Sequence, residues 1–321
     1  MSADNAGQPI CVSFGDVSER ACPLCSCRQY KVIGREHPHG QLWYSNDIFN
    51  VVLCSECHFV YVTPIPSRSW NLNYHNPRIN PDLCVGEHCS VDTFEHSKET
   101  FSYLYLKGLN EIVKRFKTLK HLSLLDVGCS EGYFVKTAVD RGINAIGCDI
   151  QPAAVERGRE EFGLDLYPGE IHDLNIQPGS MDVITLWNVM EHVDDPITLL
   201  GNARALLKAE GFLICLTPNF TLLKVRSLLR GNQKHTRPQI LPYWGGSLHP
   251  WDHINFWTPR DLDRALKMAG LINIFTLPSR RGSYPFYSIW KLYIKKLLSM
   301  ISSGNLDIIW PYIFVTASRG Q

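Results

Sequence analysis

Apolar residues change their spacing between positions 122 and 151. A short apolar run at 122–127 stops at two glycines, Gly128 and Gly132, and apolar residues then recur at helical spacing through 134–139. A second short apolar run follows at 145–148. Short apolar runs bounded by turn residues are typical of buried strands, so this stretch is predicted to be a strand–helix–strand unit.

The same alternation continues along the rest of the chain and predicts an α/β fold. We expect helices at 93–117, 155–162, 196–208 and 258–269, and further strands at 164–167, 182–187, 212–216, 271–277 and 312–317. With the two strands of the first unit, the sheet would have seven strands. The helix at 93–117 is predicted to pack, as a collar, against the first strand.

The glycine turn and the acidic residue that ends the second strand form a candidate nucleotide site. Glycines at 128 and 132 allow a ligand to approach the backbone at a helix N-terminus. Asp149 follows Gly128 by 21 residues, where a carboxylate can accept both hydroxyls of a ribose. The order G-x-G-x-x-G, which a dinucleotide site requires, is absent from this turn.

Two C-x2-C pairs near the start of the chain predict a zinc ribbon. Their spacing allows four thiolates to surround one ion, and with every position filled by cysteine the zinc would be structural. The expected ligands are Cys22, Cys25, Cys54 and Cys57. Other residues close enough in sequence to replace one of them are Cys27, His37, His39 and His58.

Composition sets the domain plan and the compartment. The chain has 321 residues, 45% of them hydrophobic, which is enough for one large domain and one small one. We expect a zinc ribbon at 1–66, a helical linker at 67–120, and a main domain at 121–321 with an insertion at about 219–257. No long uncharged apolar run and no basic segment before an apolar core occur, so we expect a cytoplasmic protein.

The turn resembles motif I of the class I S-adenosylmethionine (SAM) methyltransferases, D/E-x-G-x-G-x-G. It is read here as residues 126–132, with Ser130 in place of the middle glycine. Residues 181–193, 207–211 and 217–219 extend this resemblance to the UbiE/UbiG-like branch, or methyltransferase-23 type, with an N-terminal zinc ribbon. The resemblance implies a transferase with a Rossmann-like seven-stranded methyltransferase sheet that binds SAM.

The resemblance also implies which residues contact the cofactor. These are Asp126, Gly128, Ser130, Gly132, Asp149, Ile150, Glu170, Ile171, Trp187 and Asn188. In the family a Glu-His pair, here Glu191 and His192, sits beside the cofactor, and some quinone-pathway members link an E-x-x-E-H set to a divalent ion. Asn188 stands where the first glutamate of that set would be.

Methyl transfer to a hydroxyl, amine or carbon acid needs a base that removes the acceptor proton. The segment 249–257 gathers two histidines, an aspartate and three aromatic residues. His253 is the first candidate for the base, His249 the second, and His192 a third residue at the site. The alternative for His253 is that it closes a lid over SAM, and for His192 that it packs as part of the site wall.

Charge divides the chain and indicates an anionic acceptor. Residues 121–218 carry 6 basic and 15 acidic side chains, whereas residues 219–300 carry 13 basic and 3 acidic ones, a net charge of +10. Such a surplus attracts an anionic partner such as a sugar nucleotide, a lipid phosphate, a membrane surface or RNA. The amphipathic pattern at 283–301 predicts either peripheral membrane contact or packing on the sheet edge or in a dimer.

Three functions remain open from these residues. The first is a SAM-dependent methyltransferase of a small-molecule, sugar-linked or lipid-linked acceptor. The second is a zinc-ribbon RNA methyltransferase acting on an rRNA base, although residues 1–66 carry 4 basic and 6 acidic groups, which makes nucleic acid a poorer partner. The third is a non-catalytic scaffold that binds SAM.

Overall fold

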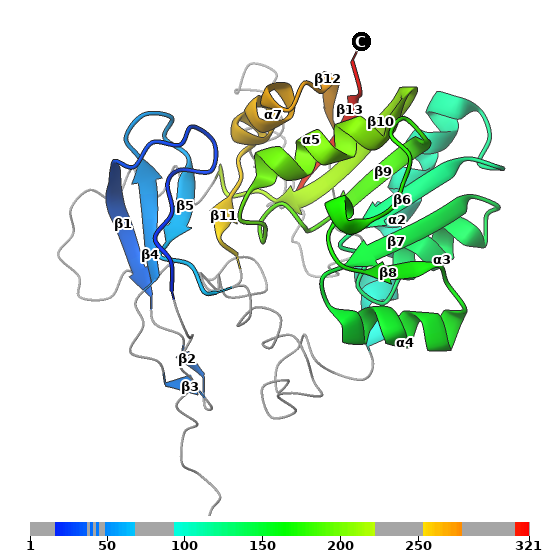
Figure 1. Cartoon of the computed structure of the whole chain (residues 1–321), viewed down its shortest axis with the longest axis horizontal. Helices are drawn as coiled ribbons and strands as arrows, with labels where there is room; N and C mark the ends of the chain where they lie inside the picture. The colour runs from blue at the N-terminus through cyan, green and yellow to red at the C-terminus, as the bar shows by residue number, and fades with distance from the viewer. Residues whose placement is uncertain are drawn as a thin grey trace, which may run out of the picture. The chain divides into compact units, whose positions relative to one another are not determined.

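The computed structural model describes residues 17–36, 39–40, 43–44, 49–67, 93–221, 253–277 and 312–320. The chain forms two compact units, of which one contains Met1–Ser90 and Arg230–Asn255 and the other Val91–Leu229 and Phe256–Gln321 (Figure 1). The N-terminal unit thus includes residues from the predicted insertion at 219–257. The limits predicted at residues 66 and 120 stay a prediction.

The N-terminal unit is built on a four-stranded sheet with the order β1-β4-β5-β11. Its strands are β1 (Tyr30–Glu36), β4 (Phe49–Cys54), β5 (Val60–Thr63) and β11 (Asn255–Phe256), and a separate pair joins β2 (His39–Gly40) to β3 (Trp43–Tyr44). All four residues of β5 are buried, and this strand lies between β4 and β11 in the sheet.

The second unit contains a seven-stranded sheet with the order β12-β13-β10-β9-β6-β7-β8. The strands are β6 (Ser123–Val127), β7 (Asn144–Asp149), β8 (Leu166–Pro168), β9 (Met181–Trp187), β10 (Leu207–Pro218), β12 (Ile272–Leu277) and β13 (Tyr312–Ser318). Strands β6 to β10 run parallel, and β13 is antiparallel to both of its neighbours. The predicted Rossmann-like seven-stranded sheet is confirmed.

Helices cover both faces of this sheet, which explains why most residues of its central strands are buried. They are α2 (Thr93–Phe116), α3 (Tyr133–Val139), α4 (Pro152–Phe162), α5 (Pro196–Leu206), α7 (Pro259–Met268) and the short 3-10 helix η2 (Ile171–Asp173). Side chains of α2, α3 and α4 share one core cluster, and α5 and α7 lie together on the other face (Figure 1). No helix in the described part of the chain is long and apolar enough to span a bilayer.

Local sequence signals set several helix starts. Proline occupies the first position of α4, α5 and α7, where its missing N–H leaves no hydrogen bond unmade. The side chains of Asp195 and Thr258 accept hydrogen bonds from the backbone N–H groups of Thr198 and Asp261, and so cap α5 and α7.

Helix α2 shares one core cluster with Leu122 and Leu124 of the predicted first strand. It also packs on β9 and β10, since a Cβ on Gly108 would lie 2.8 Å from the Trp187 ring, and the rings of Phe116 and Phe212 are 5.9 Å apart. One expectation about length was wrong. Helix α5 ends at Leu206, before the predicted residue 208, because Leu207 already pairs with Met181 at the start of β10.

Candidate functional site

The glycine turn lies between the carboxyl end of β6 and the start of α3. The N–H groups of Gly128 and Cys129 donate hydrogen bonds of 2.8 and 3.0 Å to the Cys148 carbonyl near the end of β7. Gly132 is the N-cap of α3, and its φ of 82° lies in the left-handed region that glycine tolerates. The turn is therefore fixed against the neighbouring strand at the carboxyl edge of the sheet, where ligands of open α/β sheets bind.

Side chains are excluded at both glycines of the motif. A Cβ on Gly128 would lie 2.5 Å from Val189, and one on Gly132 would lie 2.8 Å from Leu164. Ser130, at the middle position, has a φ of 51° and so adopts the conformation expected of the glycine that it replaces. A non-glycine residue held in this conformation costs about 1–2 kcal/mol, and the resemblance to the glycine motif therefore holds in backbone geometry.

Asp149 joins the end of β7 to this turn. Its Oδ2 accepts a hydrogen bond of 2.8 Å from the Ser130 N–H, and its Oδ1 accepts one of 2.8 Å from the Gln151 N–H. The carboxylate is half-buried. Each carboxylate oxygen can accept two hydrogen bonds, so these donors orient a group that can also accept from a diol.

Asp126, the first residue of the motif, is 2% exposed and lies in the sheet beneath the turn. The Thr185 hydroxyl donates a hydrogen bond of 2.6 Å to its Oδ1. Burial raises the pKa of Asp126 to about 8, the charge of Asp149 adds to the rise, and the hydrogen bond from Thr185 opposes it. Asp126 therefore holds a proton over much of the range in which an ordinary aspartate is ionised.

A cluster around Glu131 holds the turn against α4. The Arg157 Nε lies 2.6 Å from the Glu131 Oε1, and the Tyr133 hydroxyl donates to Oε2. A Cβ on Gly158 would lie 2.3 Å from the Glu131 carbonyl oxygen, so this helix touches the backbone of the turn. Sequence reasoning missed the cluster, although a charged residue inside a glycine motif and a glycine inside a helix were signals that could have indicated it.

The loop after β8 returns to the same edge. The Gly169 N–H donates a hydrogen bond of 2.8 Å to the Asp149 carbonyl, which brings the predicted cofactor residues Glu170 and Ile171 next to the end of β7. Glu170 is the N-cap of η2 and Ile171 is buried, whereas Ile150 is 40% exposed. These residues gather where the sequence predicted, and their contact with a cofactor stays a prediction.

The predicted residues at the end of β9 have different surroundings. The Trp187 ring packs with Tyr105 of α2, Phe134 of α3 and Phe314 of β13, at centroid distances of 4.9 to 6.0 Å. Asn188 has a φ of 54°, and its N–H donates to the Leu216 carbonyl at 2.8 Å. The Trp187 ring thus belongs to the core cluster, and Asn188 shapes the strand end.

The three histidines predicted to act near the acceptor fall in different parts of the chain. His192 follows the buried Glu191, whose Oε2 accepts a hydrogen bond of 2.8 Å from the Thr217 hydroxyl. His253 belongs to the N-terminal unit, next to Ile254, whose carbonyl accepts from the Val62 N–H at 2.9 Å. His249 lies outside the described residues.

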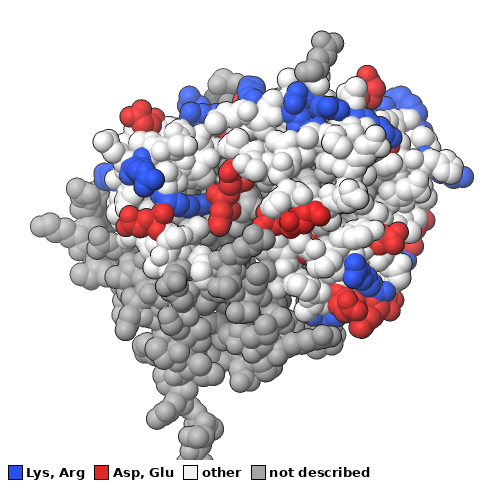
Figure 2. Space-filling model, viewed as in Figure 1, with Lys and Arg blue, Asp and Glu red and all other residues white. Residues whose placement is uncertain are grey.

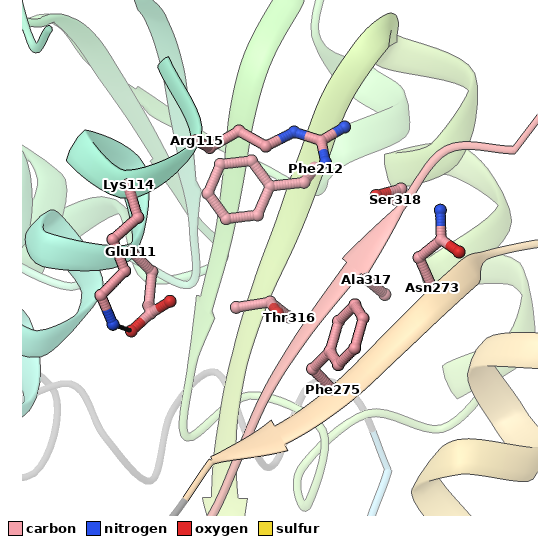
Figure 3. A pocket seen from close by; sticks show the side chains of 9 residues that line it. All are labelled: Glu111, Lys114, Arg115, Phe212, Asn273, Phe275, Thr316, Ala317 and Ser318. Carbon is pink, nitrogen blue, oxygen red and sulfur yellow. Dashed lines mark hydrogen bonds and ion pairs between the residues drawn. The ribbon is translucent and has the colours of Figure 1, made fainter. Parts of the chain in front are cut away.

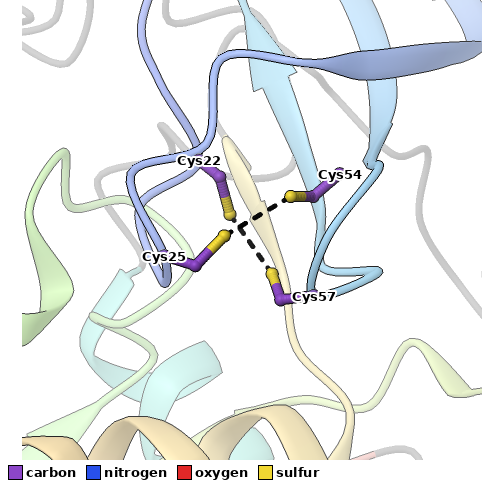
Figure 4. Close-up of side chains that lie close together, drawn as sticks. All are labelled: Cys22, Cys25, Cys54 and Cys57. Carbon is purple, nitrogen blue, oxygen red and sulfur yellow. Dashed lines mark hydrogen bonds between the residues drawn. The ribbon is translucent and has the colours of Figure 1, made fainter.

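Four cysteine sulfurs meet in the N-terminal unit (Figure 4). The sulfurs of Cys22 and Cys57 are 3.4 Å apart, those of Cys25 and Cys54 are 3.5 Å apart, and all four lie within 4.8 Å of one another. Thiolates about 2.3 Å from a tetrahedral zinc stand about 3.8 Å apart, so the cluster fits this ion. Despite desolvation, N–H groups of Cys57 and Glu56 lower the pKa of Cys54 to about 7, whereas burial raises the pKa of Cys22 and raises that of Cys57 to about 11.

Each C-x2-C pair forms a similar turn. The Ser26 N–H donates to the Cys22 carbonyl and the His58 N–H donates to the Cys54 carbonyl, and both Ser26 and His58 have a φ near 60°. The Cys27 sulfur bonds within its own turn, 3.3 Å from the Gln29 nitrogen. Among the candidate replacement ligands whose side chains are described, Cys27 and His58 therefore stand apart from the four-sulfur cluster.

A groove of about 240 Å³ lies between α2 and the strands β12 and β13 (Figure 3). Phe212 and Phe275 line it, and on its rim Lys114 pairs with Glu111 at 2.6 Å. Phe212 lies in the first half of β10, toward the amino end of the parallel strands. The groove is therefore distinct from the glycine turn at the carboxyl edge.

Comparison with known proteins is consistent with this geometry. A ubiquinone biosynthesis O-methyltransferase of Cereibacter sphaeroides is 30% identical over 155 residues, which are 47% of this chain and 60% of that protein. One from Rhodopseudomonas palustris is 25% identical over 64% of this chain and 75% of that protein. The chain thus spans about 60% of the length of the first of these curated relatives.

A solved SAM-dependent methyltransferase from Archaeoglobus fulgidus has a TM-score of 0.47 and 16% identity, with 71% of this chain and all of that one covered. The family described as "Methyltransferase domain" matches residues 97–274. This match takes in more than half of the chain, includes the glycine turn and Asp149, and confirms the resemblance inferred from the motifs. The chain therefore belongs to the methyltransferase-domain family, with the class I SAM-dependent methyltransferase fold.

Proposed function

We propose that the protein binds SAM and transfers its methyl group to a small-molecule acceptor. The observation that carries this proposal is the meeting of Asp149 with the glycine turn, 2.8 Å from the Ser130 N–H, at the adjoining carboxyl ends of β6 and β7. An acidic group in this position can accept the two ribose hydroxyls, while the left-handed turn lets the ligand approach the backbone.

Bound SAM would supply an electrophilic methyl group on a sulfonium. The chain itself would hold the ribose at Asp149, place the backbone of Gly128, Ser130 and Gly132 beside the ligand, and flank the adenine with the loop of Glu170 and Ile171. Ile150, next to Asp149, is 40% exposed and offers an apolar surface to the same ring. The buried Asp126 would support the glycine turn from its position in the sheet beneath it.

For the acceptor we propose a small molecule that is anionic and linked to a sugar or a lipid. The curated relatives are named for O-methylation in ubiquinone biosynthesis, which supports a small-molecule acceptor. The net charge of +10 in residues 219–300 supports the anionic class. Most of these basic residues, and the whole of segment 283–301, lie outside the described part of the chain. Figure 2 shows the charged side chains on one face of the described part.

His253 is our first candidate for the base that takes the acceptor proton, with His249 and His192 as further candidates. In the transfer, a bond would form between the acceptor atom and the methyl carbon as the bond from that carbon to sulfur breaks. The acceptor proton would pass to the histidine. The four cysteines Cys22, Cys25, Cys54 and Cys57 would hold a structural zinc, with no position left for a reacting water.

Titration calorimetry with SAM tests the proposal. Asp149→Ala should weaken SAM binding by about 1–3 kcal/mol, or roughly 5- to 150-fold, because it removes a partly buried acceptor of two hydroxyls. Asp165→Ala is the matched control, since Asp165 is exposed at the amino end of β8 and should leave the affinity unchanged. Equal affinity of the Asp149→Ala variant and the wild type would contradict the assignment.

The acceptor requires a separate experiment. The protein would be incubated with isotope-labelled SAM and with pooled sugar nucleotides, lipids and RNA, and the products would be identified by mass spectrometry. Label in a sugar-linked or lipid-linked anion supports the proposal. Label in RNA would instead favour the RNA methyltransferase.

A further inference from the structure

Arg20 binds strand β5 and also Ile254, which lies 234 residues further along the sequence of the same N-terminal unit. Its Nε donates a hydrogen bond of 3.0 Å to the Val62 carbonyl of β5. Its Nη2 donates at 2.6 Å to the Ile254 carbonyl and at 2.9 Å to the Asn255 Oδ1. Its backbone N–H donates at 3.1 Å to the Thr63 hydroxyl, so the residue is held from both its backbone and its side chain.

The groups that accept these bonds are in a buried setting. Val62 and Asn255 are fully buried, Thr63 and Ile254 are each 1% exposed, and the Ile254 carbonyl also accepts from the Val62 N–H at 2.9 Å. Buried carbonyls require hydrogen-bond partners, and bonds from a charged guanidinium are stronger than those between neutral groups. Loss of Arg20 would therefore loosen the short strand β11 from β5.

Arg20 lies two residues before Cys22, the first residue of the cysteine cluster. The first cysteine turn is closed by hydrogen bonds from Ser26 to Cys22 and from Cys22 to Cys27. A metal held by the cluster would fix this turn and, with it, the backbone that carries Arg20. The cluster is thereby connected through one side chain to residues 254 and 255.

We propose that Arg20 is a positioning residue through which the cysteine ribbon holds residues 253–255, and with them the backbone of His253. The inference rests on the proposed function, because that function gives His253 its role near the acceptor. It assigns the ribbon a task in the reaction beyond its own folding. Zinc would act on the acceptor step through Arg20, Ile254 and Asn255, without any contact with a reactant.

Hydrogen–deuterium exchange of the full chain tests the inference with Arg20→Met and Arg20→Lys. Arg20→Met should speed exchange of the amides of residues 254–256 at least tenfold, because it removes three side-chain bonds. Arg20→Lys, which retains the charge without the guanidinium fork, should give a smaller increase. Arg28→Met, at an exposed arginine of the same ribbon, is the control and should match the wild type.

Zinc content and SAM affinity are measured on the same samples. Arg20→Met that retains zinc and SAM affinity, exchanges faster at 254–256, and loses turnover on an identified acceptor supports the inference. Wild-type exchange in a zinc-retaining Arg20→Met overturns it. If Arg20→Met loses its zinc, exchange is measured instead on Arg20→Lys and on the wild type treated with a chelator. Unchanged exchange at residues 254–256 in both of these samples overturns the inference. A wild type that does not bind SAM refutes the proposed function instead, and the exchange result still stands.

Discussion

Gly158 lies inside α4 and directly against the glycine turn, which makes it the most informative position to change. A Cβ there would lie 2.3 Å from the Glu131 carbonyl oxygen, 2.6 Å from a Leu166 methyl group and 2.8 Å from the Glu131 carbonyl carbon. Ordinary contact begins at 3.4 Å, so Gly158→Ala must move α4 away from the turn by about 1 Å. The atom in the way belongs to backbone, which cannot rotate aside as a side chain can.

The size of the effect follows from two opposing terms. Glycine in a helix interior is about 1 kcal/mol less favourable than alanine, so the substitution gains about that much. Overpacking typically costs about 1–3 kcal/mol, and a backbone contact belongs at the upper end. We expect Gly158→Ala to lower the free energy of unfolding by about 2 kcal/mol.

Gly201 provides the matched control. It lies inside α5, and a Cβ at this position would meet no described atom within 4 Å. Gly201→Ala therefore gains the higher helix propensity of alanine without a clash, and it should stabilise the protein by about 0.5–1 kcal/mol.

Thermal unfolding and SAM calorimetry measure both variants. A change of 1 kcal/mol shifts the melting temperature of a domain of this size by about 2–4 °C, so the two variants should melt on opposite sides of the wild type. Gly158→Ala should also weaken SAM binding several-fold, because α4 packs on the turn and begins only three residues after Asp149. If Gly158→Ala melts at or above the wild-type temperature, the close packing of α4 on the turn is refuted.

Three further predictions concern other parts of the molecule. Because the pKa of Asp126 is raised to about 8, the folded protein keeps a proton that the unfolded chain releases near pH 4. The contribution of this group to the free energy of unfolding therefore falls between about pH 4 and 8, by up to about 1.4 kcal/mol per pH unit. Urea unfolding of Asp126→Asn should show a flatter pH profile than the wild type, and parallel profiles would contradict the shift. Glu131→Gln should weaken SAM binding about 3- to 30-fold by losing the charge that faces Arg157, and in the double variant with Arg157→Met the two effects should not add; full additivity in calorimetry would show that the pair is uncoupled. Cys25→Ser should lose zinc by elemental analysis and unfold residues 20–60 while SAM still binds, whereas a wild type purified without chelator and free of zinc would disprove the metal site.

Sequence patterns were sufficient for the α/β order because each element carries its own local signal. Pro196 and Pro259 mark helix starts, whereas α4 begins at Pro152, three residues before the predicted residue 155. The left-handed residues Gly128 and Gly132 are glycines for steric reasons that any such turn shares. The meeting of the two cysteine pairs was predictable for the same reason, since two cysteines three residues apart form a turn by themselves. Local signals therefore predicted the order of the helices and strands.

Contacts between distant residues could not be predicted in this way. Arg157 meets Glu131 because α4 lies over the turn, and nothing in the residues around either one specifies that partner. Arg20 lies 234 residues from Ile254 in the sequence. Strand β11 joins the sheet of the N-terminal unit only because the fold brings these distant segments together. The face covered by α2 also required the structure, because an amphipathic pattern says that a face is buried without saying against what.

The position of β13 has a consequence for synthesis of the chain on the ribosome. This strand lies between β10 and β12, and it is the ladder partner that attaches β12 to the sheet. Residues 312–318 leave the ribosome after all the other strands, so β12 must wait for about 35 residues of further synthesis, or roughly 2–7 s at 5–20 residues per second. During that interval β10 has an unpaired edge, and most of its residues are ones that the folded sheet buries. An exposed edge strand of this kind favours aggregation of nascent chains. Ribosome-bound fragments ending before Tyr312 should accordingly bind chaperones that the complete sheet releases.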